Sequence, residues 1–373
     1  MRRAMVTNEF APSHGGVERL LHERARGFQP ESLTVFAPYT EGCEAFDRLQ
    51  AYSVRRSGKP ARAVPILRDV VRSLAPLLDC LRQHRRRPFG MIECGQAFPA
   101  SLFAWLMRRC YGTPYMVWVH GNDLLGPSRH RLPGAMLRKS LLGAQAIITN
   151  SAYTAGIVAA LGIPGERIRT IPPVVDTTRF QPAPPPAALV ERYRVGDRRV
   201  LLTVCRLVER KGVDTTLEAM ARLLEVRRDV VFLVVGEGPQ RPDLERLVKR
   251  LNLRDHVVFC GSVADHELAA HYHLASVFVM PSRYLASQGS VEGLGLVYLE
   301  AMASGVPVIA ARSGGVTDIV RDGETGLVIE PGSVTDLARA LERILSDEEC
   351  ARRLRENGLE LVRAPRDWRV LEP

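Results

Sequence analysis

The stretch from Pro281 to Gly315, PSRYLASQGSVEGLGLVYLEAMASGVPVIAARSGG, carries most of the information about how this chain folds. A glycine-rich turn leads into an apolar segment of helical period, and Gly-Val-Pro then opens an aliphatic run, which predicts a loop, a helix and a buried strand. Glu292 and Glu300 stand eight residues apart, which is about 80° past two full helical turns. We therefore expect Glu292 at the helix N-terminus and Glu300 two turns later, near the same crevice.

Such a pair of carboxylates suits the binding of a sugar nucleotide. A helix N-terminus offers free N–H groups and the positive end of the helix dipole, while carboxylates accept hydrogen bonds from vicinal hydroxyls. The spacing equally allows one glutamate that caps the helix and one that is solvated. Glu300 argues against this alternative, because it lies in an apolar segment, where an unpaired charge is costly.

The motif Glu-x7-Glu in EGLGLVYLEAMASGVPVIA, preceded by CRLVERKG and GEGP, resembles glycosyltransferase family 4, the retaining GT-B glycosyltransferases. Within that family, VEGLGLVYLEA is similar to the phosphatidylinositol mannosyltransferase-like branch. The resemblance covers nearly the whole chain. It implies an α/β fold with two Rossmann-like parallel-sheet domains that face each other across a cleft, and transfer of a hexose from a nucleotide sugar to an acceptor hydroxyl with retention of configuration.

Length and composition are consistent with a cytoplasmic protein of two domains. The chain has 373 residues, enough for two separate cores. No apolar stretch approaches the roughly 18 residues of a membrane span, and the N-terminus MRRAMVTNEF lacks the apolar core of a signal peptide. Seven scattered cysteines without a C-x-x-C pair predict reduced thiols and no metal site.

The positive charge is concentrated in the first half. Residues 1–180 hold 25 Lys and Arg against 13 Asp and Glu, whereas residues 181–373 hold 26 against 28. Basic residues flank the amphipathic segment AVPILRDVVRSLAPLLDCLRQ, a pattern typical of a helix that lies on an anionic membrane surface. A solvated helix face is the alternative. Nucleic acid is not indicated, because no aromatic residues alternate with these charges and no recognition motif is present.

Apolar runs alternate with helical periods in both halves, which predicts parallel βαβ units with right-handed crossovers. The Pro-rich segment IPPVVDTTRFQPAPPPAA lacks periodicity and predicts a hinge. We place an acceptor-side domain at residues 1–175, the hinge at 176–187 and a nucleotide-sugar domain at 188–373. The expected strands are 4–7, 33–37, 91–94, 115–119, 146–149, 168–171, 200–204, 230–235, 257–259, 277–280, 306–310 and 327–329.

Candidate site residues of the first domain follow its predicted strands. Gly15 and Gly16 open a helix, so the backbone can approach a phosphate without a Cβ in the way, although a plain turn would use the same pair. His120 and Gly121 follow a buried strand; His120 is either a loop-capping residue or, as the resemblance implies, a contact to the transferred sugar. Asp123 is a candidate acceptor-side group. Asn150 and Ser151 are better explained by a helix cap.

Arg206 and Lys211 are the strongest candidates in the second domain. Arg206 follows a strand and Lys211 precedes a helix, where a cation is unfavourable unless an anion is bound. Two cations five residues apart, beside free helix N–H groups, predict a diphosphate site. Surface ion pairs with Glu209 or Asp214 are the alternative. The resemblance also assigns Arg206 and Lys211 to the leaving diphosphate.

The GEGPQR turn carries Arg241 where a dinucleotide fingerprint requires glycine, which argues against an NAD enzyme. By resemblance, Gly236 lines the nucleotide, and the base lies near Phe259 and Gly261, although Phe259 could equally be a core residue.

The resemblance further implies that Glu292 and the amides of Gly293, Leu294 and Gly295 hold the sugar hydroxyls, and that Glu300 holds the ribose. Arg206, Lys211 and the Gly15 and Gly16 amides would stabilise the departing diphosphate. Neither a metal nor a cofactor is expected.

Two departures from the family are evident. The loop between Pro281 and Glu292 is longer than usual, and the chain ends at LVRAPRDWRVLEP, where related chains continue into a helix that crosses back to the first domain. The branch resemblance favours GDP-mannose as the donor and a lipid-linked or glycan acceptor. The alternatives are a UDP-sugar-dependent glucosyl- or N-acetylglucosaminyltransferase, a non-catalytic nucleotide-sugar binding protein, and an epimerase.

Overall fold

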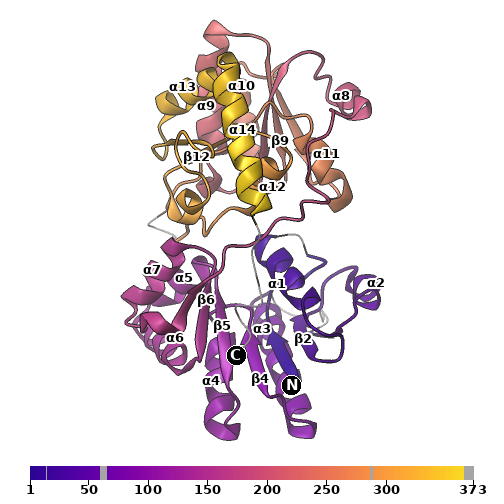
Figure 1. The fold of residues 1–373 in the computed structure, drawn as a ribbon, viewed down its shortest axis with the longest axis vertical. Helices are drawn as coiled ribbons and strands as arrows, with labels where there is room; N and C mark the ends of the chain where they lie inside the picture. Colours follow the sequence, from indigo (N-terminus) through magenta and orange to yellow (C-terminus); the bar gives the residue numbers. More distant parts are fainter. Residues whose placement is uncertain (14, 59–64, 286–288, 365–373) are drawn as a thin grey trace. The chain divides into compact units, whose positions relative to one another are not determined.

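The computed structural model describes residues 1–13, 15–58, 65–285 and 289–364, with residues 65–71 described by their backbone alone. The chain forms two compact units, one built from Met1–Pro173 and the other beginning at Val174. Each unit contains one parallel β-sheet flanked by helices (Figure 1). Of the C-terminal segment discussed above, residues 365–373 lie outside the described residues.

The elements of the first unit alternate between strand and helix along most of its length. They are β1 (Arg3–Val6), α1 (Gly16–Arg26), β2 (Leu33–Pro38), α2 (Cys43–Arg48), β3 (Ser53–Ser57), α3 (Pro65–Arg86), β4 (Met91–Cys94), α4 (Ala100–Tyr111), β5 (Tyr115–Val119), α5 (Asn122–Ser128), α6 (Arg131–Gly143), β6 (Ala146–Thr149), α7 (Ala152–Ala160) and β7 (Ile168–Thr170).

The second unit follows the same alternation and ends in two consecutive helices. Its elements are α8 (Ala187–Arg192), β8 (Arg199–Val204), α9 (Val213–Val226), β9 (Val230–Val235), α10 (Arg241–Arg250), β10 (Val257–Gly261), α11 (Leu268–Tyr272), β11 (Val277–Met280), α12 (Leu296–Ala303), β12 (Val308–Ala311), β13 (Leu327–Ile329), α13 (Val334–Ser346) and α14 (Glu348–Arg363).

Both sheets are doubly wound. The strand order is β3-β2-β1-β4-β5-β6-β7 in the first unit and β10-β9-β8-β11-β12-β13 in the second. The chain therefore reverses its direction of winding between β1 and β4 and again between β8 and β11. At such a switch point the loops that follow the two strands diverge and leave a crevice at the carboxyl ends of the strands, where ligands of open α/β sheets bind. The predicted fold class is confirmed.

All twelve predicted strands are present, with small shifts at their ends. Strand β3 was not predicted, because this edge strand is half exposed and carries Arg55 and Arg56 instead of an apolar run. In the sequence, both arginines belong to the basic residues that precede the amphipathic segment. In the structure they pair with Asp79 and Asp47, at 2.7 Å and 2.8 Å.

The sheet of the first unit divides the core into two clusters, one on each of its faces. Ala4 and Val6 of β1 point to one cluster and Met5 to the other, and β5 divides in the same way, with Val117 on the first face and Trp118 on the second. This alternation is the period of two that a strand imposes on its side chains. Helices α3 to α7 cover the first face and α1 covers the second.

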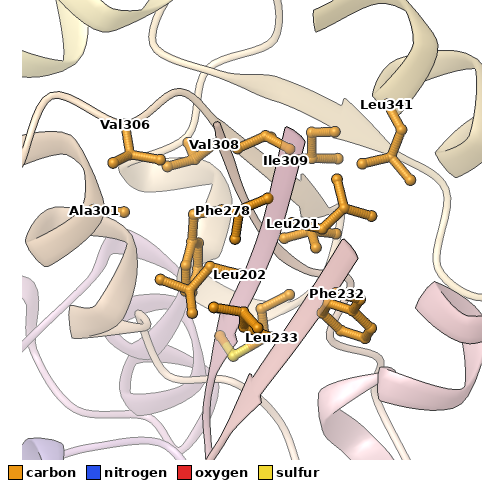
Figure 2. Packing of buried hydrophobic residues seen from close by; sticks show 14 of the residues in the cluster. Leu201, Leu202, Phe232, Leu233, Phe278, Ala301, Val306, Val308, Ile309 and Leu341 are labelled. Atoms are coloured by element: carbon orange, nitrogen blue, oxygen red, sulfur yellow. The ribbon is translucent and has the colours of Figure 1, made fainter. Parts of the chain in front are cut away.

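The core of the second unit is one continuous cluster. Figure 2 shows Leu201 and Leu202 of β8 and Phe278 of β11 at its centre, with Ala301 of α12 nearby. These residues are fully buried, and buried parallel strands of this kind read as unbroken aliphatic runs. The predicted hinge segment also packs here, because Phe180 is buried in this cluster and Arg179 pairs with Asp265 at 2.6 Å.

A buried charge cluster holds α1 against the sheet of the first unit. The Glu93 carboxylate of β4 is fully buried and accepts hydrogen bonds from Arg3 of β1 at 3.0 Å and from Arg24 of α1 at 3.1 Å and 3.3 Å. The indole N–H of Trp118 adds a longer contact at 3.4 Å. Since α1 begins at Gly16, this cluster also fixes the position of the predicted phosphate-binding turn.

Replacing Glu93 with glutamine tests this cluster. We expect Glu93→Gln to lower the free energy of unfolding by about 3–5 kcal/mol, because it leaves two buried guanidinium groups without a counter-charge. Urea unfolding followed by circular dichroism measures this loss. The matched control is Glu23→Gln on the same helix, whose exposed pair with Arg26 should contribute less than about 1 kcal/mol. Equal small losses for the two variants would contradict the assigned role of the cluster.

Candidate functional site

The second unit brings three charged residues together at its β8/β11 switch point. The turn Glu209–Lys211 follows β8 and the loop that contains Glu292 follows β11. The Oε2 atom of Glu292 accepts a hydrogen bond from Lys211 Nζ and another from Arg210 Nη1, each at 2.6 Å. Lys211 and Glu292 were both predicted from the sequence, and the structure shows that they are in direct contact.

The ionised form of Glu292 is strongly favoured. Burial alone would raise its pKa, but the Lys211 ammonium and the Arg210 guanidinium outweigh that effect and hold the pKa of Glu292 below its ordinary value. Oε1 of Glu292 accepts no hydrogen bond from a described residue. The carboxylate is therefore fixed through one oxygen and keeps the other as an acceptor for a hydroxyl.

Arg206 and Lys211 are not engaged in the surface ion pairs that were the alternative to a diphosphate site. Lys211 is 8% exposed and pairs with Glu292, while Glu209 and Asp214 pair with Arg283 instead. Arg206 is exposed, and its side chain pairs with no described residue. Its guanidinium is thus available to an external anion, and it belongs to the same loop after β8 as Arg210 and Lys211, which share a single carboxylate.

The turn after β12 packs against the loop that carries Glu292. The N–H of Gly315 donates to the carbonyl oxygen of Glu292 at 3.0 Å. Gly314 has a φ of +60°, and a Cβ added there would come within 2.1 Å of the same carbonyl oxygen. Only glycine fits such a position without displacing the loop, so the SGG turn, residues 313–315, fixes the position of the Glu292 backbone.

The helix after Glu292 begins later than predicted. Helix α12 starts at Leu296 with Gly295 as its N-cap residue at a φ of +85°, so Glu292 lies in the preceding loop and the two-turn geometry does not apply. Gly293 and Leu294 lie in this loop, with Leu294 buried. The prediction failed because a left-handed glycine interrupts the helical period without interrupting the apolar pattern.

Glu300 is buried within α12 and its carboxylate accepts a hydrogen bond. The Tyr272 hydroxyl of α11 donates to Glu300 Oε2 at 2.8 Å, and Glu300 is 3% exposed. Neither Glu292 nor Glu300 is a solvated surface residue, so that alternative is wrong. The ribose contact assigned to Glu300 by resemblance stays a prediction.

The turn after β9 packs against the loop after β8. Gly236 has a φ of +123°, and a Cβ on it would meet the Cys205 carbonyl oxygen at 1.9 Å. Its N–H donates to Gly261 at the end of β10. Phe259 is partly buried, and the Arg241 guanidinium lies 5.6 Å from its ring centroid. The glycine turn and the strand end predicted to line the nucleotide are therefore adjacent.

In the first unit, the predicted phosphate-binding turn holds a carboxylate of the protein itself. Gly15 is the N-cap residue of α1, and a Cβ on Gly15 would come within 2.1 Å of Oε2 of Glu18. Burial raises the pKa of Glu18 to about 7, and nearby Glu9 adds to this rise. An anion that binds at Gly15 and Gly16 would have to displace this flexible side chain.

His120 and Asp123 tie together the loops after β4 and β5. His120 Nε2 lies 2.8 Å from the Gly95 carbonyl oxygen, and Asp123 accepts hydrogen bonds from the backbone N–H groups of His120 and Ala97. The Asp123 carboxylate thus positions the loop that carries His120. The sugar contact of His120 and the acceptor contact of Asp123 stay predictions.

The predicted helix cap is confirmed, since the Ser151 side chain accepts a hydrogen bond from the Thr154 N–H at the start of α7. Two further arginines were not predicted: Arg210 lies within the predicted diphosphate turn and donates to Glu292, and Arg283 donates to Asp214 directly after that turn. A local signal for Arg210 was available, because it stands beside Lys211 in ERKG. Its carboxylate partner is 82 residues away in the chain and cannot be found from local spacing.

Comparison with known proteins agrees with this geometry. Residues 190–361 match the family model described as glycosyl transferases group 1, and residues 14–179 match that of glycosyltransferase family 4. A GDP-mannose-dependent alpha-(1-6)-phosphatidylinositol monomannoside mannosyltransferase of Mycobacterium tuberculosis is 36% identical over 377 residues, covering 99% of this chain and 96% of the relative. A 2-deoxystreptamine glucosyltransferase of Streptomyces kanamyceticus is 35% identical and covers 79% of this chain and 76% of the relative.

Among solved structures, the Anabaena protein HepE in complex with UDP aligns with a TM-score of 0.81 at 19% identity, covering 97% of this chain and 94% of the other. This likeness extends the shared fold to both units. The two family models and the 36% identity over nearly the full length show that the chain belongs to glycosyltransferase family 4, the GT-B glycosyltransferases.

Proposed function

We propose that this enzyme transfers a mannosyl residue from GDP-mannose to a hydroxyl of a lipid-linked acceptor of the phosphatidylinositol mannoside class, with retention of configuration and without a metal ion. The observation that carries the proposal is the buried contact of Glu292 with Lys211 and Arg210 at the β8/β11 switch point. The mycobacterial relative, which is named for this donor and acceptor class, matches the chain along its whole length.

The charges in the second unit suit a departing diphosphate. Arg206 is exposed and unpaired among the described residues, and Lys211 and Arg210 contribute two positive charges against one carboxylate. Preorganised cations of this kind stabilise negative charge as it develops in a transition state. The proposed roles are therefore diphosphate binding for Arg206 and Lys211, and sugar-hydroxyl binding for Glu292 through its open oxygen.

The proposed reaction is a front-face displacement. The bond between the sugar C1 and the diphosphate oxygen breaks, the acceptor oxygen bonds to C1 on the same face, and the acceptor proton passes to the leaving phosphate oxygen. Such a step needs no carboxylate nucleophile, which agrees with the use of Glu292 in an ion pair. An α-linked product, as in the name of the mycobacterial relative, is what retention gives from an α-configured nucleotide sugar.

A second donor has support from one specific observation. The glucosyltransferase from Streptomyces kanamyceticus is nearly as similar in identity as the mannosyltransferase, although it covers less of the chain. A UDP-glucose-type donor is therefore the competing candidate, and it would use the same diphosphate site.

We further propose that α3 and the end of α4 lie on the cytoplasmic face of an anionic membrane. Leu74 and Leu78 of α3 are 46% and 52% exposed, and Arg82 and Arg85 continue the same exposed stripe. Arg85 also donates to the Tyr111 hydroxyl of α4, at 2.9 Å. Exposed leucines beside arginines are typical of helices that bind anionic lipid. Among the described residues, no helix is long and apolar enough to span a membrane.

The donor is identified by thermal unfolding in the presence of GDP, UDP, ADP and their sugar conjugates. A ligand at 100 times its Kd stabilises the folded state by about 2.7 kcal/mol, and we expect GDP and GDP-mannose to be selected. Transfer to a phosphatidylinositol mannoside in detergent should then continue in EDTA, and the one-bond C1–H1 coupling of the product should show the α-anomer.

Each outcome of this test has a separate meaning. Selection of UDP-glucose would replace mannose with glucose and leave the glycosyltransferase assignment intact. Loss of transfer in EDTA, restored by a divalent cation, would reject metal independence. A β-linked product would reject retention.

Lys211 and Glu292 should be separable by their effects on nucleotide and on sugar. Lys211→Met removes a charged hydrogen bond to the diphosphate, worth about 1.5–3 kcal/mol, and should weaken GDP binding by about 10- to 100-fold. Glu292→Gln replaces the charged acceptor of the sugar hydroxyls with a weaker, neutral one and leaves both cations in place, so transfer should fall much more than GDP binding does.

Isothermal titration with GDP and a transfer assay measure both effects. Glu324→Gln, which alters an exposed pair with Arg321, is the control and should change neither. If Glu292→Gln weakened GDP binding as much as Lys211→Met, the separate roles would be rejected.

Membrane binding is tested by flotation with vesicles of neutral phosphatidylcholine and with vesicles that also contain anionic phosphatidylinositol. Each arginine near an anionic surface contributes about 1 kcal/mol, so replacing Arg82, Arg85 and Arg86 with glutamine should reduce binding to anionic vesicles by tenfold or more. Leu74→Ser with Leu78→Ser should reduce it too. Val226→Ser, at a residue that is 74% exposed in the second unit, is the control. No preference of the unaltered protein for anionic vesicles would reject the proposal.

A further inference from the structure

Near its start, the long loop after β11 carries Arg283, whose guanidinium contacts residues around the predicted diphosphate turn. Arg283 Nη2 donates to Oδ2 of Asp214 at 2.8 Å and lies 3.8 Å from Oε1 of Glu209, while Nη1 lies 3.4 Å from the Thr215 hydroxyl. Asp214 and Thr215 belong to the first turn of α9, and Glu209 begins the turn that carries Arg210 and Lys211. One guanidinium therefore contacts residues on both sides of the two cations.

The backbones of the loop and the turn are also in direct contact. The N–H of Arg283 donates to the carbonyl oxygen of Arg210 at 2.7 Å. Gly212, which ends the turn, has a φ of +71°, and a Cβ on it would come within 2.2 Å of the Pro281 carbonyl oxygen. The Arg283 side chain is 21% exposed, so its ion pairs are partly shielded from solvent.

In the segment ERKGVD, the order of charges decides how strongly the two cations can act on an external anion. Glu209 and Asp214 flank Arg210 and Lys211 in the sequence and would compete with any external anion for these cations. Arg283 takes both carboxylates as its own partners, and the two cations turn instead to Glu292, at the other end of the same loop. The loop thus supplies both the counter-charge for the acidic residues and the carboxylate that orients the basic ones.

We propose that Arg283 is a positioning residue of the donor site, which sets the turn Glu209–Lys211 and neutralises Asp214 and Glu209 so that the positive charge of Arg210 and Lys211 acts on the donor diphosphate. This inference rests on the proposed function, since it takes this turn as the diphosphate site. Arg283 itself touches no substrate in this assignment.

The test compares a nucleotide with its nucleoside. Arg283→Gln should weaken binding of GDP about tenfold in isothermal titration and leave binding of guanosine, which lacks phosphates, unchanged. In the transfer assay, KM for the donor should rise more than kcat falls. If the donor panel selects uracil, UDP and uridine are the probes. Arg283→Lys should recover part of the affinity, because it restores the charge without the forked geometry.

A second substitution separates neutralisation from simple loss of structure. In the Arg283→Gln background, Asp214→Asn removes the carboxylate that is left uncompensated and should return GDP affinity to within about threefold of the unaltered protein. The matched control is Arg227→Gln. Arg227 pairs with Asp229 at 2.8 Å, directly after the C-terminal end of α9 and about 20 Å along that helix from its start, so GDP binding should not change.

Equal losses of GDP and guanosine binding in Arg283→Gln would overturn the proposal, because they would indicate general disruption of the site. Failure of Asp214→Asn to restore GDP affinity would overturn the neutralising role. These outcomes differ from failure of the proposed function, in which the unaltered protein would bind none of the nucleotides and transfer no sugar. If the unaltered protein is active and Arg283→Gln matches it, only the present inference fails.

Discussion

The second unit depends on the pairing of one buried carboxylate with two cations. Glu292 is almost fully buried, and desolvation would make its charge unfavourable without Lys211 and Arg210. The three residues come from two loops that follow adjacent strands, β8 and β11. The ion pairs therefore join the loop after β8 to the loop after β11 at the switch point. The SGG turn, the left-handed Gly295 and the long loop after β11 all help to fix the position of that carboxylate.

The first unit uses buried charge for a different purpose. Its Glu93 cluster lies against the face of the sheet that α1 covers, with both arginines nearly inaccessible to solvent. Fully paired groups of this kind fix a single arrangement of the elements they join. Among the described residues, Oε1 of Glu292 and the side chain of Arg206 have no partner, whereas in the Glu93 cluster both carboxylate oxygens are engaged. That difference in hydrogen-bond satisfaction distinguishes the proposed binding site from the structural charge cluster of the first unit.

Strand positions could be predicted best from the sequence where a strand is buried along its whole length. Strands such as β9 and β11 are aliphatic throughout, because both faces of a parallel sheet are covered, and their limits could be predicted to the residue. The start of α12 was misplaced, since a glycine at positive φ leaves the apolar pattern unchanged. Glu93, Arg210 and Arg283 were not found as members of charge clusters, because each pairs with residues far away in the chain. The chemical type of a site can be predicted from local motifs, but its network of partners depends on the folded topology.

Strand β3 gives the basic first half a role unrelated to any ligand. It is the outermost strand of its sheet, and an unpaired strand edge is a template on which another chain can add. Arg55 and Arg56 stand on this edge, with Asp79 and Asp47 as their partners. A second molecule that added a strand here would have to strip water from Arg55, whose side chain is 44% exposed. Part of the positive charge thus protects the protein against edge-to-edge aggregation, which matters most at the high local concentration of a crowded cell.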